Sequence, residues 1–176
     1  MDSTAVTIFD FGRPDGPAWR SVDDVVMGGI SSSRLHPTSE GTALFEGELS
    51  LENRGGFASV RTALGPLDLS AYTGVEIRVR GDGKRYRLRF RTNERFDGVA
   101  YQAEFSTRGD GWQTVQLPFV EFQPTYRGRI LEGVEPLATD RIHQVGLMIA
   151  DRQAGRFRLE VAWLRAFSEN PDVLKP

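Results

Sequence analysis

Apolar and polar residues alternate along most of the chain with a period of two. In residues 75–80 (VEIRVR) a valine or an isoleucine alternates with a charged residue, and in residues 86–91 (YRLRFR) a tyrosine, a leucine or a phenylalanine alternates with an arginine. Successive side chains of a β-strand point to opposite faces, so this pattern predicts strands with one buried and one exposed face. The same alternation marks six further segments, which are residues 43–52, 57–64, 100–106, 112–119, 143–151 and 156–167.

Turn signals rich in glycine and proline separate these segments. One of them, GDGK at residues 81–84, predicts a tight hairpin between residues 75–80 and 86–91. We expect eight or nine strands in one domain, and they need two packed sheets or a closed barrel, because a single sheet would leave an apolar face uncovered. We therefore predict an all-β fold, a jelly-roll β-sandwich of two antiparallel sheets. A single domain is expected over residues 1–176, with a core from about residue 5 to residue 168 and a short tail at residues 169–176.

The bulk composition argues against several classes of protein. The chain has 22 basic and 24 acidic residues and a net charge of −2, which argues against a nucleic-acid partner held by overall positive charge. It has no cysteine, so disulfides and zinc–thiolate sites are impossible. No apolar run approaches the roughly 18 residues of a membrane span, and residues 1–16 lack the basic and apolar regions of a signal peptide. We expect a cytoplasmic protein with no membrane span.

One stretch, SVDDVVMGGISSS at residues 21–33, looks more like a site than any other. A calcium site there would use the carboxylates of Asp23 and Asp24 together with backbone carbonyls, although the spacing of a calcium-binding loop is absent. An anion site would instead use the backbone N–H groups of Gly28 and Gly29.

A third interpretation, which we favour, makes the same stretch a structural entry loop. In this interpretation Trp19 and Met27 pack under the end of the sandwich and an aspartate caps a short helical turn. The two glycines then take positive φ angles before the next strand. Such a loop can still present a surface, including Ser31, to a partner.

Arginines occupy the polar positions of two neighbouring segments. If residues 81–84 form a hairpin, all five face the same side of one sheet: Arg78, Arg80, Arg87, Arg89 and Arg91. Gln102, Glu104 and Glu76 are available as partners. Two interpretations stay open: a solvated face with ion pairs that contribute about 0–1 kcal/mol each, or a polar face that binds a carbohydrate, an anionic ligand or an acidic protein segment.

A carbohydrate site would need an aromatic platform beside these polar groups. The candidates are Tyr101, Trp112 and Tyr126, whereas Trp163 follows the alternation of residues 157–161 and is assigned to the core. In PTYRGRIL (124–131), the glycine at position 128 marks a loop that either folds over the sheet edge, anchored by its arginines, or binds a ligand.

Enzyme signatures are missing from the sequence. It contains no phosphate-binding loop, no dinucleotide fingerprint and no serine-hydrolase or metalloprotease motif. Glu46, Glu48 and Glu104 are the carboxylates considered for a glycosidase pair. The two RGD tripeptides, at residues 80–82 and 108–110, fall at expected hairpin turns. We predict a protein that is not an enzyme and has no cofactor.

Five blocks of sequence together resemble the complex I intermediate-associated protein 30 family. In order they are WRSVDDVVMGGISSSRL, FEGELSLENRGGFASVR, LDLSAYTGVEIRVRGDGKRYRLRFR, WQTVQLPFVEFQPTYRGR and DRQAGRFRLEVAWLRAF, and the resemblance runs from Phe9 to Phe167. It implies a galactose-binding-like jelly roll. It also implies a role like that of the mitochondrial assembly factor for respiratory complex I from which the family takes its name. The family pattern usually has asparagine where this chain has Asp23.

The expected function is therefore that of a non-enzymatic binding module that contacts protein subunits of a membrane complex under assembly. The alternative is a module of the same fold that binds a carbohydrate or a small ligand. No nucleic-acid partner and no metal site are predicted, Asp23 and Asp24 being the metal candidates considered. The candidate contact residues are Trp19, Asp24, Met27, Gly28, Gly29, Ser31, Arg61, Arg87, Arg89, Arg91, Tyr101, Glu104 and Arg127.

Overall fold

The computed structural model describes residues 4–13, 16 and 18–169. In these residues thirteen strands and three short 3-10 helices follow one another. The strands are β1 (Thr4–Asp10), β2 (Arg20–Ser21), β3 (Ser32–Pro37), β4 (Ala43–Leu49), β5 (Ala58–Leu67), β6 (Gly74–Arg80), β7 (Arg85–Arg91), β8 (Ala100–Ser106), β9 (Trp112–Pro118), β10 (Gln123–Tyr126), β11 (Arg129–Ile130), β12 (Ile142–Ile149) and β13 (Gly155–Ser168). The helices are η1 (Asp24–Met27), η2 (Glu52–Arg54) and η3 (Phe119–Glu121). Most of the expected C-terminal tail, residues 170–176, lies outside the described residues.

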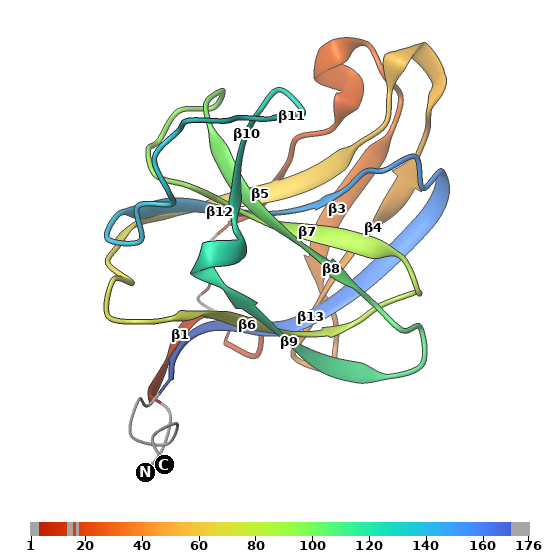
Figure 1. Ribbon diagram of the computed structural model, residues 1–176. Coiled ribbons are helices and arrows are strands. Elements are labelled where there is room, and N and C mark those ends of the chain that lie inside the picture. The colour runs from red at the N-terminus through yellow and green to blue at the C-terminus, as the bar shows by residue number, and fades with distance from the viewer. Residues whose placement is uncertain (1–3, 14–15, 17, 170–176) are drawn as a thin grey trace.

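The strands form two sheets, in which every pairing is antiparallel. The first sheet has the order β3-β4-β13-β6-β9, with β1 also paired to β13. The second sheet has the order β11-β10-β8-β7-β12-β5-β2. In Figure 1 the strands β5, β12 and β7 lie above β6, β13 and β9 of the first sheet. The predicted all-β sandwich of two antiparallel sheets is thus confirmed, and each of the eight alternating segments forms a strand.

The core lies between the two sheets and takes the apolar half of each alternating strand. Ile77 of β6 and Leu88 of β7 are fully buried. The rings of Phe45 and Phe157 meet at 5.0 Å between centroids, and Tyr86 of the opposite sheet lies 6.2 Å from Phe45. Burying a side chain of this size stabilises the fold by about 1.5–3 kcal/mol.

The predicted hairpin at residues 81–84 is wrong. These residues lead from β6 in the first sheet to β7 in the second, and residues 107–111 lead from β8 back to β9. The two crossings lie side by side, because Gly83 N donates to the Thr107 hydroxyl at 3.0 Å and Thr107 N donates to the Lys84 carbonyl at 3.1 Å. The crossing places the apolar faces of β6 and β7 on the inner sides of opposite sheets, where Ile77 and Leu88 are buried. Both RGD tripeptides therefore lie at crossings.

This crossing divides the five arginines that the hairpin would have gathered. Arg78 and Arg80 lie on the outer face of the first sheet. Arg87, Arg89 and Arg91 lie on the outer face of the second sheet. A single face with five arginines does not form.

The assignment of Trp163 to the core is also wrong. The pairing of β13 with β6 shifts register between Val161 and Trp163. Such a bulge moves the following residues by one position, so Leu164 takes the inward place and is fully buried. Trp163 remains half-buried on the outer face, with the guanidinium of Arg165 over its ring at 3.8 Å.

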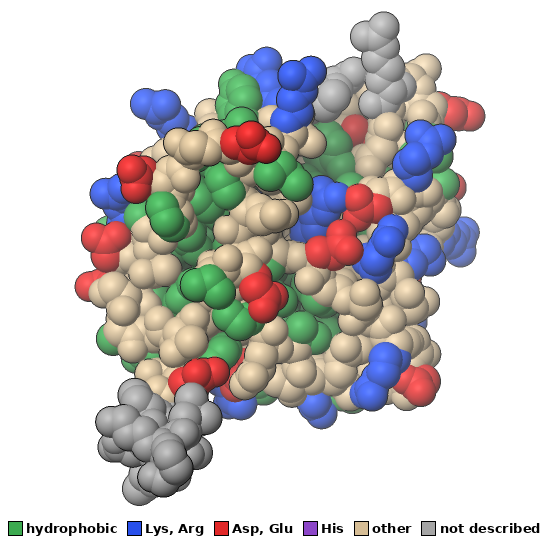
Figure 2. All heavy atoms as spheres, in the orientation of Figure 1, with side chains coloured by type: hydrophobic (Ala, Val, Ile, Leu, Met, Phe, Trp, Pro, Cys, Tyr) green, Lys and Arg blue, Asp and Glu red, His purple; other side chains and the backbone are tan. Residues whose placement is uncertain are grey.

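The surface carries both signs of charge. On the side of the molecule shown in Figure 2, acidic and basic side chains are interspersed, and hydrophobic atoms gather in the left half of the view. Among the described residues, no helix has the length and apolar character needed to cross a membrane.

Candidate functional site

The stretch at residues 21–33 folds around the carboxylate of Asp24, which is 0% exposed. Its oxygens accept hydrogen bonds from the backbone N and the hydroxyl of Ser31, at 2.9 and 2.5 Å. The backbone N–H groups of Gly56 and Phe57 donate to it as well, at 2.7 and 3.3 Å. Burial alone would raise the pKa of Asp24, but these hydrogen bonds lower it below its usual value. Asp24 thereby connects the loop that follows β2 to the loop that precedes β5.

Glycine is favoured at each of these two adjacent positions for a different structural reason. Gly28 follows η1 with φ at 93°, a left-handed conformation that favours glycine. Gly29 is needed for close approach, because a Cβ there would lie 2.5 Å from the Asp24 carboxylate and 2.9 Å from Cα of Gly55. The expected positive φ is therefore found at Gly28 and not at Gly29.

Asp23 makes a second set of connections from the N-cap position of η1, although its side chain does not cap the helix. It accepts from the backbone N and the hydroxyl of Ser33, at 3.1 and 2.5 Å, and from the backbone N of Ser59 at 3.0 Å. Burial raises the pKa of Asp23, and the neighbouring Asp24 adds to that rise.

These contacts support the structural interpretation of the stretch. The carboxylates face hydrogen-bond donors, which is the reverse of what a cation needs. Among the residues described, no group of three or more His, Cys, Asp or Glu side chains could hold a metal. The N–H groups of Gly28 and Gly29 already donate to the carbonyls of Val25 and Asp24, at 3.0 and 2.9 Å, so they do not form an anion nest.

Trp19 packs against two phenylalanines at the end of β1. Its ring packs edge-on against Phe9 at 5.3 Å between centroids and lies 6.0 Å from Phe11. This agrees with the expected packing under the end of the sandwich. The side chain of Met27 lies outside the described part of the structure.

The second set of candidates meets on the outer face of the second sheet. Gly146 of β12 pairs with Arg61 of β5 on one side and with Arg89 of β7 on the other, and Gln144 pairs with Arg91. Because Gly146 has no side chain, only backbone separates the first two arginines across the sheet. We call Arg61, Arg89 and Arg91 the arginine cluster.

The arginine cluster has neutral partners in place of carboxylates. Arg61 Nη1 donates to the Phe96 carbonyl at 2.7 Å, and Arg91 Nη1 donates to the Gly98 carbonyl at 2.8 Å. Arg89 Nη2 donates to the Thr125 hydroxyl at 3.3 Å, whereas its Nε is buried without a partner in the described residues. None of the ion pairs formed by the described residues includes a member of the cluster.

Burial and mutual repulsion act on the cluster together. Burial first, and then the charges of Arg91 and Arg20, lower the pKa of Arg61 to about 10. Burial and the neighbouring guanidinium groups lower the pKa of Arg89 to about 9, and burial also lowers that of Arg91. These lowered pKa values mean that keeping the three guanidinium groups charged costs the folded protein free energy, which a bound anion would offset.

Residues 92–99 form a loop that covers the arginine cluster. The ring of Phe96 lies 4.9 Å from the guanidinium of Arg61. Gln144 Nε2 donates to the carbonyls of Asn93 and Arg95, at 2.9 Å each. The cavity left over the cluster is about 10 Å³, which is room for roughly one water-sized group.

A larger cavity of about 570 Å³ adjoins the cluster and shares Arg61 and Gln144 with it. Trp19, Arg20, His143 and one carboxylate, that of Glu94, line it as well. Among the described residues, Trp19 Nε1 and His143 Nδ1 are buried without hydrogen-bond partners.

The remaining candidates lie close to the cluster or elsewhere. Arg87 forms ion pairs with Asp151 and with Glu104, the latter at 4.0 Å. Arg127 pairs with Asp97 of the covering loop at 2.7 Å.

The three candidate platforms do not gather beside the arginine cluster. Tyr101 is in the core, where its hydroxyl donates to the Glu135 carbonyl at 2.8 Å, so it offers no platform on this face. Trp112 belongs to β9 in the first sheet, under the guanidinium of Arg80 at 5.1 Å. Tyr126 has Arg127 over its ring at 5.2 Å.

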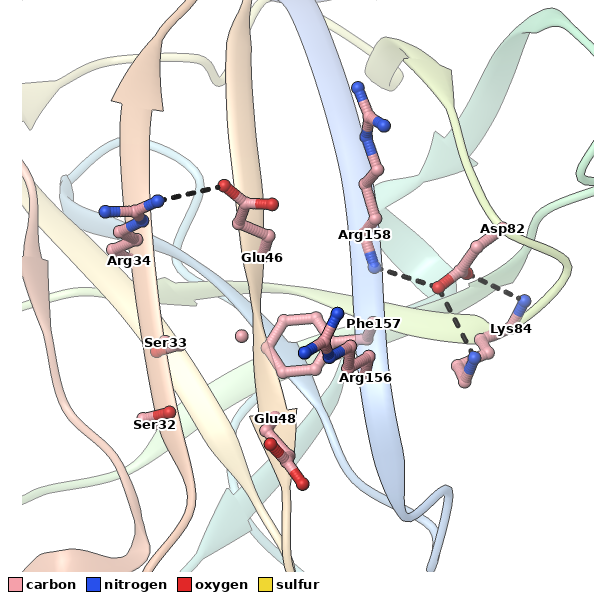
Figure 3. A pocket seen from close by; sticks show the side chains of 11 residues that line it. Ser32, Ser33, Arg34, Glu46, Glu48, Asp82, Lys84, Arg156, Phe157 and Arg158 are labelled. Atoms are coloured by element: carbon pink, nitrogen blue, oxygen red, sulfur yellow. Dashed lines mark hydrogen bonds and ion pairs between the residues drawn. The ribbon is translucent and has the colours of Figure 1, made fainter.

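A groove of about 650 Å³ crosses the outer face of the first sheet (Figure 3). Some of its charges are paired: Arg34 of β3 points to Glu46 of β4 at 3.4 Å, and His36 also contacts that carboxylate at 2.6 Å. Arg156 and Arg158, which also line the groove, belong to none of the ion pairs of the described residues. The hydrogen bond with His36 lowers the pKa of Glu46. Glu104 lies on the second sheet, so a glycosidase pair that includes it and Glu46 does not form.

The sequence interpretation missed the residues that enclose the arginine cluster. These are Phe96 and Asp97 of the covering loop, Gln144 and Gly146 of β12, and His143 of the adjoining cavity. The available signal was Phe96, an aromatic residue in an otherwise polar turn segment, which is 49% exposed.

Comparison with known proteins gives a family and a fold. The model of the family described as Complex I intermediate-associated protein 30 matches residues 9–161. A protein of Schizosaccharomyces pombe that is named only as uncharacterized is 31% identical, over 91% of this chain and 84% of its own length. The mitochondrial Complex I intermediate-associated protein 30 of Drosophila melanogaster is 26% identical over 89% of this chain, and the chain spans 61% of that relative's length.

The fold resembles that of a carbohydrate-binding module. The family 11 module from Clostridium thermocellum, solved with a mixed-linked tetrasaccharide, superposes with a TM-score of 0.69 over 93% of this chain and 95% of the module. The sequence identity is 16%, so this similarity shows the fold alone.

Proposed function

Because the chain belongs to the Complex I intermediate-associated protein 30 family, we propose that it is a non-enzymatic binding module that contacts subunits of respiratory complex I, or of a related membrane complex, during assembly. The names of the Drosophila and mouse relatives support this role. The chain spans 61% and 38% of the lengths of those two relatives, so the proposal concerns the part of the family that this chain contains.

The observation that carries the proposal is the arginine cluster on an outer sheet face. Arg61 is buried, Arg89 and Arg91 are partly buried, and none of the three forms an ion pair with a described carboxylate. Such charges are costly to the isolated protein, and a negatively charged partner would offset that cost. An assembly factor acts by binding partly assembled intermediates better than the finished complex, which shifts their populations.

Affinity purification of the tagged protein from its native host, followed by mass spectrometry, tests the proposal. We expect enrichment of subunits of complex I over a matched bait, for which a tagged family 11 carbohydrate-binding module has the same fold. Equal recovery of those subunits with both baits would contradict an assembly role.

The second candidate is a carbohydrate-binding module, which the fold similarity favours. We rank it second because the aromatic residues that would form a sugar platform are dispersed: Tyr101 is in the core and Trp112 lies on the other sheet. Of the three candidate platforms, Tyr126 alone is exposed on the sheet that carries the arginine cluster. A glycan array screens it directly, and saturable binding of a neutral oligosaccharide would reverse the ranking.

The cellular location is a separate part of the proposal. The cytoplasmic location expected from the sequence stays a prediction. It differs from the location in the names of the Drosophila and mouse relatives, which is mitochondrial. Immunodetection in fractionated host cells tests it, and recovery in an organelle fraction would contradict it.

A further inference from the structure

We propose that the arginine cluster and the adjoining cavity form a docking site for an acidic segment of a partner protein, with one carboxylate of that segment bound among Arg61, Arg89 and Arg91. This inference rests on the proposed function, because it gives the chemistry of the partner contact. It also makes claims about individual side chains that can be tested without knowing the partner.

The first observation is that the arginines of the cluster form no ion pair within the described part of the chain. Arg61 is 8% exposed, and none of the ion pairs of the described residues reaches the cluster. The nearby carboxylate of Asp97 is held by Arg127 at 2.7 Å. In the same sheet Arg87 has Asp151 and Glu104, whereas no member of the cluster has a carboxylate at ion-pair distance among the described residues.

The second observation is that Arg89 leaves hydrogen-bond donors unused in the part of the chain that is described. A guanidinium has five N–H donors in a planar fork that matches a carboxylate. Arg89 uses Nη2 on the Thr125 hydroxyl at 3.3 Å, and its Nε–H points to no acceptor in the described structure. Buried polar groups are nearly always paired, with protein or with water, so this donor is available to an acceptor that enters the site.

The shape of the site gives the third step. The space over the cluster is about 10 Å³, so a carboxylate oxygen can enter only if the loop of residues 92–99 gives way or exchanges its carbonyls for the ligand. The adjoining cavity of about 570 Å³ holds more of the ligand and shares Arg61 with the cluster. Trp19 Nε1 in its wall is a second buried donor without a described partner.

These features favour an acidic side chain over the other anions. A planar carboxylate is thinner than a tetrahedral phosphate and is better suited to so narrow a space. A neutral sugar would add no negative charge to the three arginines, for which Asp97 is the nearby carboxylate. An acidic peptide supplies both the carboxylate and a chain that fills the larger cavity.

The test uses a capped hexaglutamate peptide as the probe, measured by titration calorimetry at low and at physiological ionic strength. We expect binding of hexaglutamate and none of capped hexaglutamine. Arg89→Met should weaken hexaglutamate binding about tenfold or more, since truncating one member of a buried charge pair acts mainly on affinity. Arg156→Met, at an exposed position on the other sheet, should leave it unchanged.

The folding of Arg89→Met is itself informative. The Arg89 guanidinium is partly buried and forms no ion pair with the described residues, so its replacement by an apolar side chain of similar length should leave the melting temperature unchanged or raise it. Arg61→Met is the second variant if Arg89→Met folds poorly. Equal loss of binding in Arg89→Met and Arg156→Met, or no binding of hexaglutamate to the wild type, would overturn the proposal.

Inorganic phosphate separates the two sources of an oxyanion. Failure of phosphate to displace hexaglutamate at similar concentration supports a protein segment as the ligand. Displacement by phosphate at equal or lower concentration would overturn it in favour of a free anion. Capture of complex I subunits by Arg89→Met as by the wild type would leave the proposed function in place and remove the cluster as its contact.

Discussion

Replacing Asp24 with alanine is the sharpest perturbation of the loop at residues 21–33. Its carboxylate is 0% exposed and accepts from the backbone N–H groups of Ser31, Gly56 and Phe57 and from the Ser31 hydroxyl. Alanine provides no acceptor. The three backbone donors would then be left in a closed space, because Gly29 and Gly55 pack against the carboxylate.

The expected magnitude follows from those donors. Each buried donor left without a partner costs about 1–3 kcal/mol. The Ser31 hydroxyl contributes less to this loss of stability, because it can also donate to the Ser50 carbonyl at 3.2 Å. Taking the low end for three backbone donors, and a fraction for the hydroxyl, gives about 3–4 kcal/mol lost from the free energy of unfolding. For a domain of this size that loss lowers the melting temperature by roughly 6–16 °C.

Thermal and urea unfolding of wild type and Asp24→Ala measure this loss. Asp140→Ala serves as the control, because Asp140 is exposed, and should change stability by less than about 0.5 kcal/mol. Equal stabilities of the Asp24 and Asp140 variants would refute the claim that the buried carboxylate holds the loop.

Three further predictions concern the metal, the pH and the core. Addition of calcium, or of a chelator, should leave the melting temperature unchanged, because Asp23 and Asp24 face hydrogen-bond donors; a calcium-dependent rise would restore the metal interpretation. Burial would raise the pKa of Glu160, but hydrogen bonds from Thr42 and Arg80 lower it below its usual 4.5. The stability that Glu160 contributes should thus be complete above that pH and decline as the pH falls through its lower native value, and Glu160→Gln should flatten this part of an unfolding profile. Phe45→Ala should lose about 3–5 kcal/mol in denaturant unfolding, since the ring is fully buried; a loss below about 1 kcal/mol would contradict its place in the core.

The fold was largely predictable because the alternation of apolar and polar residues indicates which face of each strand is buried. Every strongly alternating segment formed a strand, but the expected eight or nine strands fall short of the thirteen found among the described residues. The short β2, β10 and β11 and the strands β1 and β3 carry too weak a pattern to be recognised. The pattern does not say which sheet a strand joins. Residues 81–84 have the composition of a hairpin turn, yet they carry the chain from one sheet to the other. At Trp163, a one-residue bulge reversed the expected face.

The candidate site was predictable only in part. Arg89 and Arg91 were identified from their polar positions on one strand, and their shared face is as expected. The proximity of Arg61 depends on β5 and β7 both flanking β12, which is a long-range pairing that no local pattern encodes. The covering loop was missed for the same reason, because its contacts to Gln144 join residues about fifty positions apart.

The most direct test of the central claim is the assembly state of complex I in host cells that lack this protein. Native electrophoresis with immunodetection resolves complete complex from partial assemblies. The account predicts accumulation of partial assemblies and loss of complete complex, with recovery when the wild-type chain is restored. A normal amount of complete complex, formed at the normal rate in its absence, would contradict the assembly role.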